Sequence, residues 1–299
     1  MSVATLPDSA TLPNSATLPD PATREDAVTV CPAPAFDMGL MEFHQAELRG
    51  QGYTIFRDII TPTQLTEMRR TIDQRIAAQQ VEIRQQNYHG VNLVVWHPAF
   101  AEVATNPLLL KTVEGLIGDD CILSSCNLGA RIPGCEAQGF HRDTGIWGGS
   151  MPFMPFPVGI QTAWCIDDFT LENGATRLIP GSHSDPQPVK DRPGIQVVAP
   201  AGSIIAFDCQ AFHAGEANRS QQVRRGVLTL YIRSWIKPQT DHRRSFPAVM
   251  IPTSSPELLR LLAFRRQSPV ELPDGTSTII SAPGATYFYD QPPAGPIAY

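Results

Sequence analysis

The sequence predicts a mostly β domain with flanking helices, built as an antiparallel sandwich or barrel. Three observations lead to this fold class. Short runs of β-branched and aromatic residues recur between Gly, Pro and Asn turns in the second half of the chain, and amphipathic helices precede them. The 299 residues are 42% hydrophobic and 17% charged, as in a globular protein, and the 28 prolines predict many loops.

The N-terminal segment is a repeat of low complexity. Residues 4–21 consist of the hexamers ATLPDS, ATLPNS and ATLPDP. Proline and small polar residues bury too little surface to offset the entropy lost on ordering the chain. We therefore expect residues 1–35 to form a disordered tail and residues 36–299 to form a single domain.

The first predicted helix begins at residue 62. Thr61 is a typical N-cap, Pro62 suits the first helical position, and Gln64 completes a capping box. A second helix is predicted for residues 106–118, and a short third one begins after Ser255. One apolar stripe of the first helix consists of Leu65, Met68, Ile72 and Ile76.

The pattern changes to strands after Cys121. The predicted strands are residues 122–132, 158–166, 175–179, 195–198, 203–207 and 227–235. These strands form the core, with the helices as a front layer. The Pro- and Gly-rich stretch that runs to Tyr299 is predicted as either a lid or a loose tail.

Composition excludes several classes of partner. With 23 Lys and Arg against 29 Asp and Glu, the net charge is −6, so nucleic acid is not expected as a partner. No apolar stretch is long enough for a membrane span and no secretory signal is recognisable, which predicts a cytoplasmic protein. The six scattered cysteines are expected to be reduced. Monomer and homodimer both remain open.

A His-x-Asp motif suggests a metal site. His141 and Asp143 lie two residues apart, so on an extended strand both side chains point to one side. His213 follows 72 residues later, after the predicted strand 203–207. Two imidazoles and one carboxylate on one face of a metal form the facial triad of non-haem Fe(II) oxygenases. Zinc accepts the same ligands and stays open at this point.

A basic residue supports a cosubstrate site next to this metal. Arg224 lies eleven positions after His213, and a hairpin of this length can bring its guanidinium beside the metal. The planar fork of a guanidinium binds a carboxylate through two hydrogen bonds. Arg225 offers the same group on the opposite side of the strand, and a solvated surface charge is the alternative interpretation.

These elements together resemble a known family. Four elements occur in this order: the His-x-Asp motif, the run from Ala163 to Thr176, the motif Pro-Gly-Ser-His that ends at His183, and His213 with an arginine at +11. Over residues 43–240 the chain is similar to the phytanoyl-CoA dioxygenase family. The resemblance implies a double-stranded β-helix (a jelly-roll, cupin-like fold) and an Fe(II)- and 2-oxoglutarate-dependent dioxygenase that uses O2 and releases succinate and CO2.

The resemblance also implies the roles of single residues. His141, Asp143 and His213 would be the catalytic iron ligands, Arg224 would bind the C5 carboxylate of 2-oxoglutarate, and Gln138 would lie near this cosubstrate. We expect His183 to be structural, because a fourth protein ligand would block an open metal position.

The substrate is expected to be a small, largely apolar metabolite, with a role in natural-product biosynthesis as first choice. The loop of residues 145–157 follows the metal motif and is rich in aromatic residues, methionine and proline. Hydroxylation is the default outcome, while desaturation, cyclisation, epoxidation and demethylation stay open. A non-catalytic metal-binding β-barrel module is the alternative function. The predicted substrate-binding residues are Tyr88, Trp147, Phe153 and Trp235.

Overall fold

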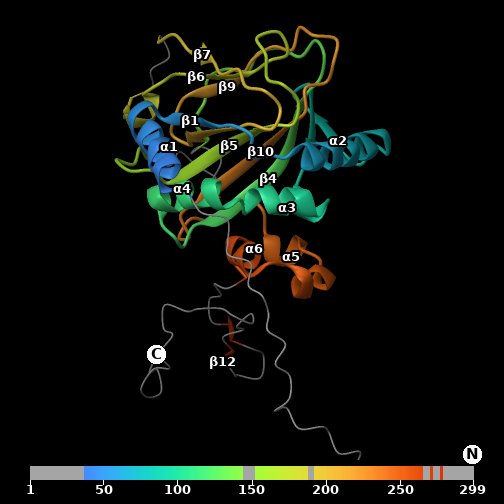
Figure 1. The fold of residues 1–299 in the computed structure, drawn as a ribbon, viewed down its shortest axis with the longest axis vertical. Coiled ribbons are helices and arrows are strands. Elements are labelled where there is room, and N and C mark those ends of the chain that lie inside the picture. The colour runs from blue at the N-terminus through green and yellow to red at the C-terminus, as the bar shows by residue number, and fades with distance from the viewer. Residues whose placement is uncertain (1–36, 144–151, 188–191, 265–269, 272–276, 279–299) are drawn as a thin grey trace, which may run out of the picture. The chain divides into compact units, whose positions relative to one another are not determined.

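A computed structural model describes residues 37–143, 152–187, 192–264, 270–271 and 277–278 (Figure 1). The predicted tail of residues 1–35 and most of the C-terminal stretch lie outside the described residues. None of the described helices is both long and apolar enough to cross a membrane.

The main element of the fold is an antiparallel sheet. Its strand order is β1-β8-β5-β10-β4-β3-β2, so β10 lies at its centre between β5 and β4. All six predicted strands have counterparts in the structure, whereas β1, β2 and β3 of this sheet and the short strands at residues 213–215, 270–271 and 277–278 were not predicted. The strands are β1 (Tyr53–Phe56), β2 (Glu82–Arg84), β3 (Asn87–Gly90), β4 (Ile122–Arg131), β5 (Gly159–Cys165), β8 (Ile204–Asp208) and β10 (Gly226–Ile232).

A smaller antiparallel sheet has the order β7-β6-β9. It consists of β6 (Thr176–Leu178), β7 (Ile195–Gln196) and β9 (His213–Gly215), and it lies on the side of the large sheet away from the helices (Figure 1). A separate two-stranded ladder joins β11 (Val270–Glu271) and β12 (Ser277–Thr278). The predicted class, mostly β with flanking helices, is confirmed.

Helices cover the other face of the large sheet (Figure 1). In the capping box of α2, the Thr61 hydroxyl accepts from the Gln64 backbone N–H at 3.3 Å, and the Gln64 side chain accepts from the Thr61 N–H at 3.0 Å. The α-helices are α1 (Met38–Gln51), α2 (Pro62–Ala77), α3 (Pro98–Ala104), α4 (Pro107–Ile117), α5 (His242–Ser245) and α6 (Pro256–Leu261). The 3-10 helices are η1 (Leu93–Val95), η3 (Ser182–Ser184) and η4 (Ala248–Thr253).

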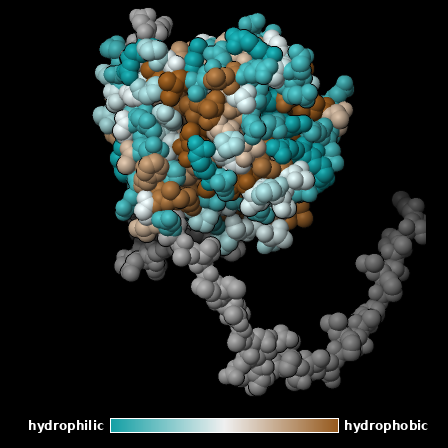
Figure 2. Space-filling view, turned by 45° about the horizontal axis from the view of Figure 1, so that its top comes forward, coloured by the Kyte–Doolittle hydropathy of each residue, from teal (hydrophilic) through white to brown (hydrophobic). Residues whose placement is uncertain are grey.

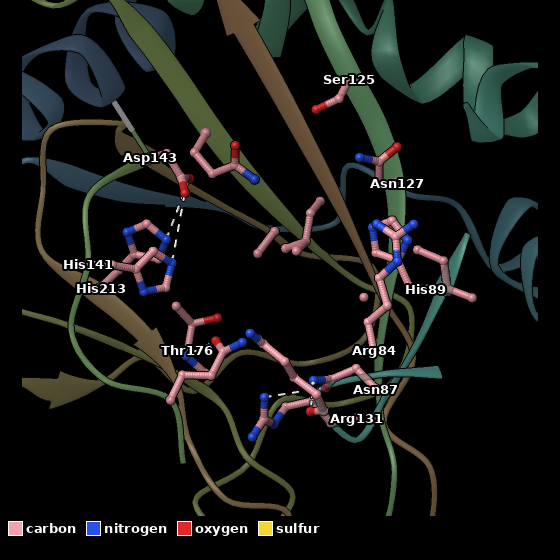
Figure 3. A pocket seen from close by; sticks show the side chains of 18 of the residues that line it. Arg84, Asn87, His89, Ser125, Asn127, Arg131, His141, Asp143, Thr176 and His213 are labelled. Atoms are coloured by element: carbon pink, nitrogen blue, oxygen red, sulfur yellow. Dashed lines mark hydrogen bonds and ion pairs between the residues drawn. The ribbon is translucent and has the colours of Figure 1, made fainter. Parts of the chain in front are cut away.

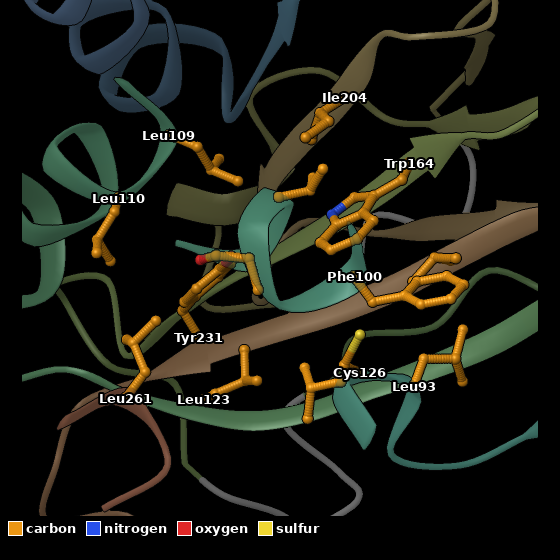
Figure 4. Packing of buried hydrophobic residues seen from close by; sticks show 14 of the residues in the cluster. Leu93, Phe100, Leu109, Leu110, Leu123, Cys126, Trp164, Ile204, Tyr231 and Leu261 are labelled. Carbon is orange, nitrogen blue, oxygen red and sulfur yellow. The ribbon is translucent and has the colours of Figure 1, made fainter. Parts of the chain in front are cut away.

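The largest hydrophobic core lies between these helices and the large sheet (Figure 4). Trp164 of β5 and Tyr231 of β10 are completely buried there, together with Phe100 of α3. The polar atoms of both aromatic strand residues are satisfied: the Tyr231 hydroxyl donates to the Ala104 carbonyl at 2.9 Å, and the Trp164 indole N–H donates to the Thr162 hydroxyl at 3.0 Å. Because side chains alternate along a strand, the neighbours of these residues face the small sheet.

The surface fits a globular domain. In the space-filling view, hydrophilic residues cover most of the visible face, and hydrophobic residues form smaller patches between them (Figure 2). The five cysteines in the described part are buried and free, as predicted. Burial raises the pKa of the Cys126 and Cys165 thiols to about 12, so both are uncharged at neutral pH.

Candidate metal centre and cavity

The structure brings His141, Asp143 and His213 together. The backbones of His141 and His213 pair as an antiparallel bridge, in which each N–H donates to the other carbonyl at 3.0 Å. The Asp143 N–H donates to the Cys209 carbonyl, which ties the motif to the end of β8. Asp143 Oδ1 lies 3.9 Å from His141 Nε2, and Asp143 Oδ2 lies 3.5 Å from His213 Nε2 (Figure 3).

Both imidazoles are oriented by the backbone. Nδ1 of His141 lies 3.0 Å from the Gly139 carbonyl, and Nδ1 of His213 lies 3.1 Å from the Ala211 carbonyl. A carbonyl can only accept, so each Nδ1 carries the proton and each Nε2 keeps its lone pair for a metal. Burial lowers the pKa of His213, which favours the neutral form that coordinates metals.

The donor set fits a divalent metal ion. The three ligand atoms lie within 4.8 Å of one another, so a single ion can contact two nitrogens and one oxygen. Three protein ligands leave further positions open, which suits Fe(II) chemistry with a bound cosubstrate. His183 lies elsewhere: its Nε2 is 3.2 Å from the Arg49 carbonyl, and it does not line the cavity described next. This placement agrees with the structural role expected for His183.

A cavity of about 430 Å³ adjoins the triad and lies between the two sheets. Its size is in the usual range for small-molecule sites. The large sheet supplies most of its wall, and the small sheet contributes Thr176, His213 and Gly215. A neighbouring hollow shares Gln85, Gln138 and His141 with it, so the metal centre is reached from both.

Arg224 lies in this cavity without a carboxylate partner among the described residues. It is 6% exposed, its guanidinium stacks 3.9 Å from the centroid of the Phe169 ring, and its Nε has no hydrogen-bond partner. Burial, with a smaller effect of the nearby Arg131, lowers the pKa of Arg224 to about 10. The group therefore stays charged at neutral pH, and a buried cation without a counter-ion is a strong site for an anion.

Arg225 faces the other way. Its Nε lies 2.7 Å from an oxygen of Asp73, and its Nη1 lies 2.9 Å from an oxygen of Asp167. These two carboxylates belong to the helix side of the protein, outside the cavity. The two adjacent arginines thus take opposite sides of the chain, as the alternation of extended residues requires.

A second buried arginine was missed in the sequence. Arg131, at the end of β4, is 3% exposed and lines the same cavity. It donates to the Asn87 side chain at 3.4 Å and to the Glu136 carbonyl at 2.6 Å, while its Nε has no partner. Gln138 accepts from the Gly215 N–H at 3.0 Å, and a Cβ on Gly215 would approach a nitrogen of Arg131 to 2.6 Å. The glycine therefore allows this close packing beside the triad.

Three of the predicted substrate-binding residues, Tyr88, Phe153 and Trp235, do not line the described cavity. Tyr88 packs against the hydrophobic core, because it alternates with Asn87 and His89, which do line the cavity. Trp235 is 63% exposed and Phe153 stacks 5.9 Å from the Arg142 guanidinium, and neither lines the cavity. Trp147 lies outside the described residues.

The structure describes residues 152–157 of the loop 145–157, and hydrogen bonds anchor this part to the rest of the protein. Gln210 accepts from the Met154 N–H at 2.9 Å and donates to its carbonyl at 3.0 Å. Met154 also packs against a small hydrophobic cluster near Val158 and Ile232.

The cavity is more polar than expected. An apolar pocket was expected, but many of the residues that line the cavity have hydrogen-bonding side chains. Those missed in the sequence include Ser125, Asn127, Gln161 and Thr176.

Comparison with known proteins agrees with this site. A family model for phytanoyl-CoA dioxygenase (PhyH) matches residues 48–226, more than half of the chain. Dioxygenase trt7 of Aspergillus terreus is 29% identical over 237 residues, which cover 73% of this chain and 82% of that protein. Dioxygenase af480 of Aspergillus fumigatus is 30% identical over 172 residues, 54% of each chain.

Solved structures share the fold at low identity. The non-haem alpha ketoglutarate dependent epimerase SnoN from nogalamycin biosynthesis superposes with a TM-score of 0.59 at 16% identity, covering 68% of this chain and 87% of that chain. SnoN is also known in complex with Fe3+, alpha ketoglutarate and nogalamycin RO. The carbocyclase SnoK gives a TM-score of 0.56 at 18% identity, covering 69% of this chain and 90% of that chain. The predicted double-stranded β-helix is thereby confirmed.

Proposed function

Because the chain belongs to the phytanoyl-CoA dioxygenase family, we propose that it oxidises a small metabolite of natural-product biosynthesis, with hydroxylation as the reaction. The protein is an oxidoreductase of the dioxygenase class, and it uses Fe(II), 2-oxoglutarate and O2. The iron supplies the O2 and one-electron chemistry. Overall, substrate, O2 and 2-oxoglutarate would give hydroxylated substrate, succinate and CO2.

One observation carries the proposal: the triad and a buried arginine without a carboxylate partner line the same cavity. His141, Asp143 and His213 would hold the iron through two Nε2 atoms and a carboxylate. Arg224 would bind the distal carboxylate of 2-oxoglutarate through its guanidinium, whose charge the described residues leave uncompensated. Gln138 would lie beside the cosubstrate while its oxygen accepts from the Gly215 N–H.

The protein's own residues would also exclude water and orient the reactants. The walls of the cavity on β5, β8 and β10 carry Ala163, Phe207 and Leu228, which would surround the carbon skeleton of the substrate. Phe207 also packs against His213, with ring centroids 4.6 Å apart and the rings tilted by 51°, and this contact would restrict the orientation of the imidazole. Rigid ligands and an apolar wall together would hold one C–H bond toward the metal.

The natural-product role rests on the relatives. The two fungal relatives are named dioxygenases, and SnoN and SnoK belong to nogalamycin biosynthesis. A small-molecule substrate follows from the enzyme class, and the cytoplasmic location predicted from the sequence is part of this proposal. A metal-binding module without catalysis is the second candidate, but it would have no use for the buried charge of Arg224.

The test is turnover with a panel of metabolites. The protein is loaded anaerobically with Fe(II) and 2-oxoglutarate, mixed with oxygenated buffer, and assayed for succinate and for a product that has gained one oxygen atom. We expect succinate from the iron-loaded protein, and more of it with an accepted substrate. A metal-binding module would retain the iron but form no succinate above the level of an iron control without protein.

A further inference from the structure

The face of the large sheet that forms the cavity wall is divided into two halves. The half on β5, β8 and β10 carries the apolar residues Ala163, Phe207 and Leu228, together with the polar Gln161 of β5. The half on β2, β3 and β4 carries hydrogen-bonding side chains, and Figure 3 shows them grouped at a distance from the triad. This second group, the polar wall, consists of Arg84, Asn87, His89, Ser125 and Asn127.

Asn127 offers a donor to the cavity. Its side-chain oxygen accepts from the Asn92 backbone N–H at 3.3 Å. Because a backbone N–H can only donate, the oxygen must face Asn92 and the amide NH2 must lie on the other side. Figure 3 shows the nitrogen of Asn127 on the side of the cavity. The NH2 has no partner among the described residues, so it is free to bind an acceptor.

Arg84 offers a positive charge with free donors. Its Nε binds Glu82 at 2.7 Å, but its two Nη atoms have no hydrogen-bond partner among the described residues. The ion pair with Glu82 is at the surface, with the two side chains 58% and 67% exposed. Such pairs contribute little free energy, so the guanidinium can turn toward a ligand at small cost.

His89 lies beside Arg84 in Figure 3. Burial and the charge of Arg84 both lower the pKa of His89, which keeps its imidazole neutral at pH 7. A neutral imidazole still has one N–H donor. The polar wall therefore presents several donors next to a cation, a combination that suits a carboxylate.

The charges of the cavity agree with this conclusion. Three arginines line it, Arg84, Arg131 and Arg224, whereas Asp143 is the single carboxylate among the described lining residues. The charges of a divalent iron and of the dianionic cosubstrate would cancel each other. The positive charges of the three arginines would then still exceed the single negative charge of Asp143. An anionic substrate would reduce this excess of positive charge. Arg84 is available to it, because its two Nη atoms have no partner among the described residues and its ion pair with Glu82 is at the surface.

We propose that the substrate is an organic acid, whose carboxylate binds the Nη atoms of Arg84 and the NH2 of Asn127 while its carbon skeleton contacts Leu228 and Phe207. This proposal rests on the proposed function, because it places the rest of the molecule toward the iron. It narrows the substrate class from a small metabolite to one that carries a carboxylate at the end remote from the oxidised carbon.

The experiment compares acids with their methyl esters. The probes are the straight-chain acids from hexanoic to hexadecanoic acid and cinnamic acid, each paired with its ester. Binding is measured anaerobically on the full chain with Fe(II) and saturating 2-oxoglutarate, from the change in the visible absorption of the iron complex. Charge-assisted hydrogen bonds predict that at least one acid binds about tenfold more tightly than its ester.

Variants assign this preference to the polar wall. In Arg84→Gln we expect the ratio of acid to ester affinity to fall close to one, and Arg84→Lys should recover part of it. Asn127→Asp should weaken acid binding and leave ester binding unchanged. The matched control is Arg70→Gln, an exposed arginine of α2 that pairs with Glu67 outside the cavity and should keep the full preference.

Several results would overturn the proposal. It is wrong if no acid of the panel binds more tightly than its ester, if the preference survives Arg84→Gln, or if the acids compete with 2-oxoglutarate and so occupy the site of Arg224. In each of these cases iron-dependent succinate formation would still support the proposed function. If the iron complex with 2-oxoglutarate does not form, the proposed function fails first and the inference falls with it.

Discussion

Replacing Arg224 by methionine should have opposite effects on cosubstrate binding and on stability. Arg224 is buried, has an unpartnered Nε and has no carboxylate partner in the described structure. Methionine is also long and flexible, so it can occupy the space beside the Phe169 ring without the charge. The same substitution therefore removes the proposed binding partner of 2-oxoglutarate and an uncompensated buried cation.

The loss of cosubstrate affinity should be large. Removing one partner of a buried, hydrogen-bonded charge pair costs about 2 to 5 kcal/mol. At about 1.4 kcal/mol for each factor of ten, the dissociation constant of 2-oxoglutarate should rise by roughly thirtyfold to several thousandfold. Arg225→Gln breaks the ion pairs with Asp73 and Asp167 instead, so it should change this constant by less than about twofold.

The free energy of unfolding of the apo protein should change in the other direction. The pKa of Arg224 falls from 12.5 to about 10, mainly through burial. At about 1.36 kcal/mol per pKa unit, this corresponds to an upper bound of about 3 kcal/mol of unfavourable free energy for the charged form. We expect Arg224→Met to raise the unfolding free energy by about 1 to 3 kcal/mol and Arg225→Gln to lower it slightly.

Two assays decide this prediction. Anaerobic titration of 2-oxoglutarate into the Fe(II) protein, followed by visible absorption, gives the dissociation constant, and urea unfolding of the metal-free protein gives the stability. The assignment would be reversed if Arg225→Gln weakened binding more than Arg224→Met. A stability loss in Arg224→Met, with wild-type affinity for the cosubstrate, would show that the guanidinium serves packing alone.

Three further predictions concern stability and substrate binding. Burial lowers the pKa of His242 from 6.5 to about 4, so the contribution of the neutral imidazole to the free energy of unfolding is complete above pH 6.5 and is lost as the pH falls toward 4. Urea unfolding at both ends of this range should show that the unfolding free energy of the wild type falls by up to about 3 kcal/mol more than that of His242→Gln. Phe100→Ala, in the core, should lower the unfolding free energy by about 3 to 5 kcal/mol, with unchanged affinity of the folded fraction for 2-oxoglutarate, as unfolding curves and titration can check. Leu228→Ala should weaken substrate binding by about 1 to 3 kcal/mol, whereas Phe153→Ala should leave substrate binding unchanged because Phe153 lies outside the described cavity. Product yields measured over a range of substrate concentrations compare the two variants.

Six strands and three helices, the third being α6 after Ser255, could be predicted because local signals determine them. The capping box at Thr61, the Asn-Pro start of α4 and the β-branched runs act over a few residues, and the structure confirms each of them. Helix α1 gave no such signal, because the residues that it buries are His44, Gln45 and Leu48, two of them polar. The strands β1, β2 and β3 are four residues or fewer, too short for a clear pattern.

The candidate site, too, could be predicted only in part from the sequence. The spacing of His141, Asp143 and His213 and the arginine at +11 were recognisable as a motif, and the structure places all four in one cavity. The wall of the cavity depends on which face of each strand turns inward. Along β4, the residues Ser125, Asn127 and Arg131 alternate with apolar neighbours, and this alternation could have identified the polar wall.

The positions of the aromatic residues could not be predicted from the sequence, for a physical reason. Tyr88 and Trp235 were expected in the pocket from their type and position, but an aromatic side chain contributes as much to a core or a surface as to a site. Only the register of β3 against β4 decides that Tyr88 points to the core and His89 to the cavity.

The most direct test of the proposed metal centre is Fe(II) binding by its three ligands. The stoichiometry and affinity of Fe(II) are measured anaerobically for wild type, His141→Ala, Asp143→Ala and His213→Ala, and succinate formation is measured in the same samples after oxygen is admitted. We predict one Fe(II) per wild-type chain, greatly weakened binding in each variant, and no iron-dependent succinate from any of them. Full iron affinity together with full iron-dependent turnover in His141→Ala would contradict the assignment of the metal centre.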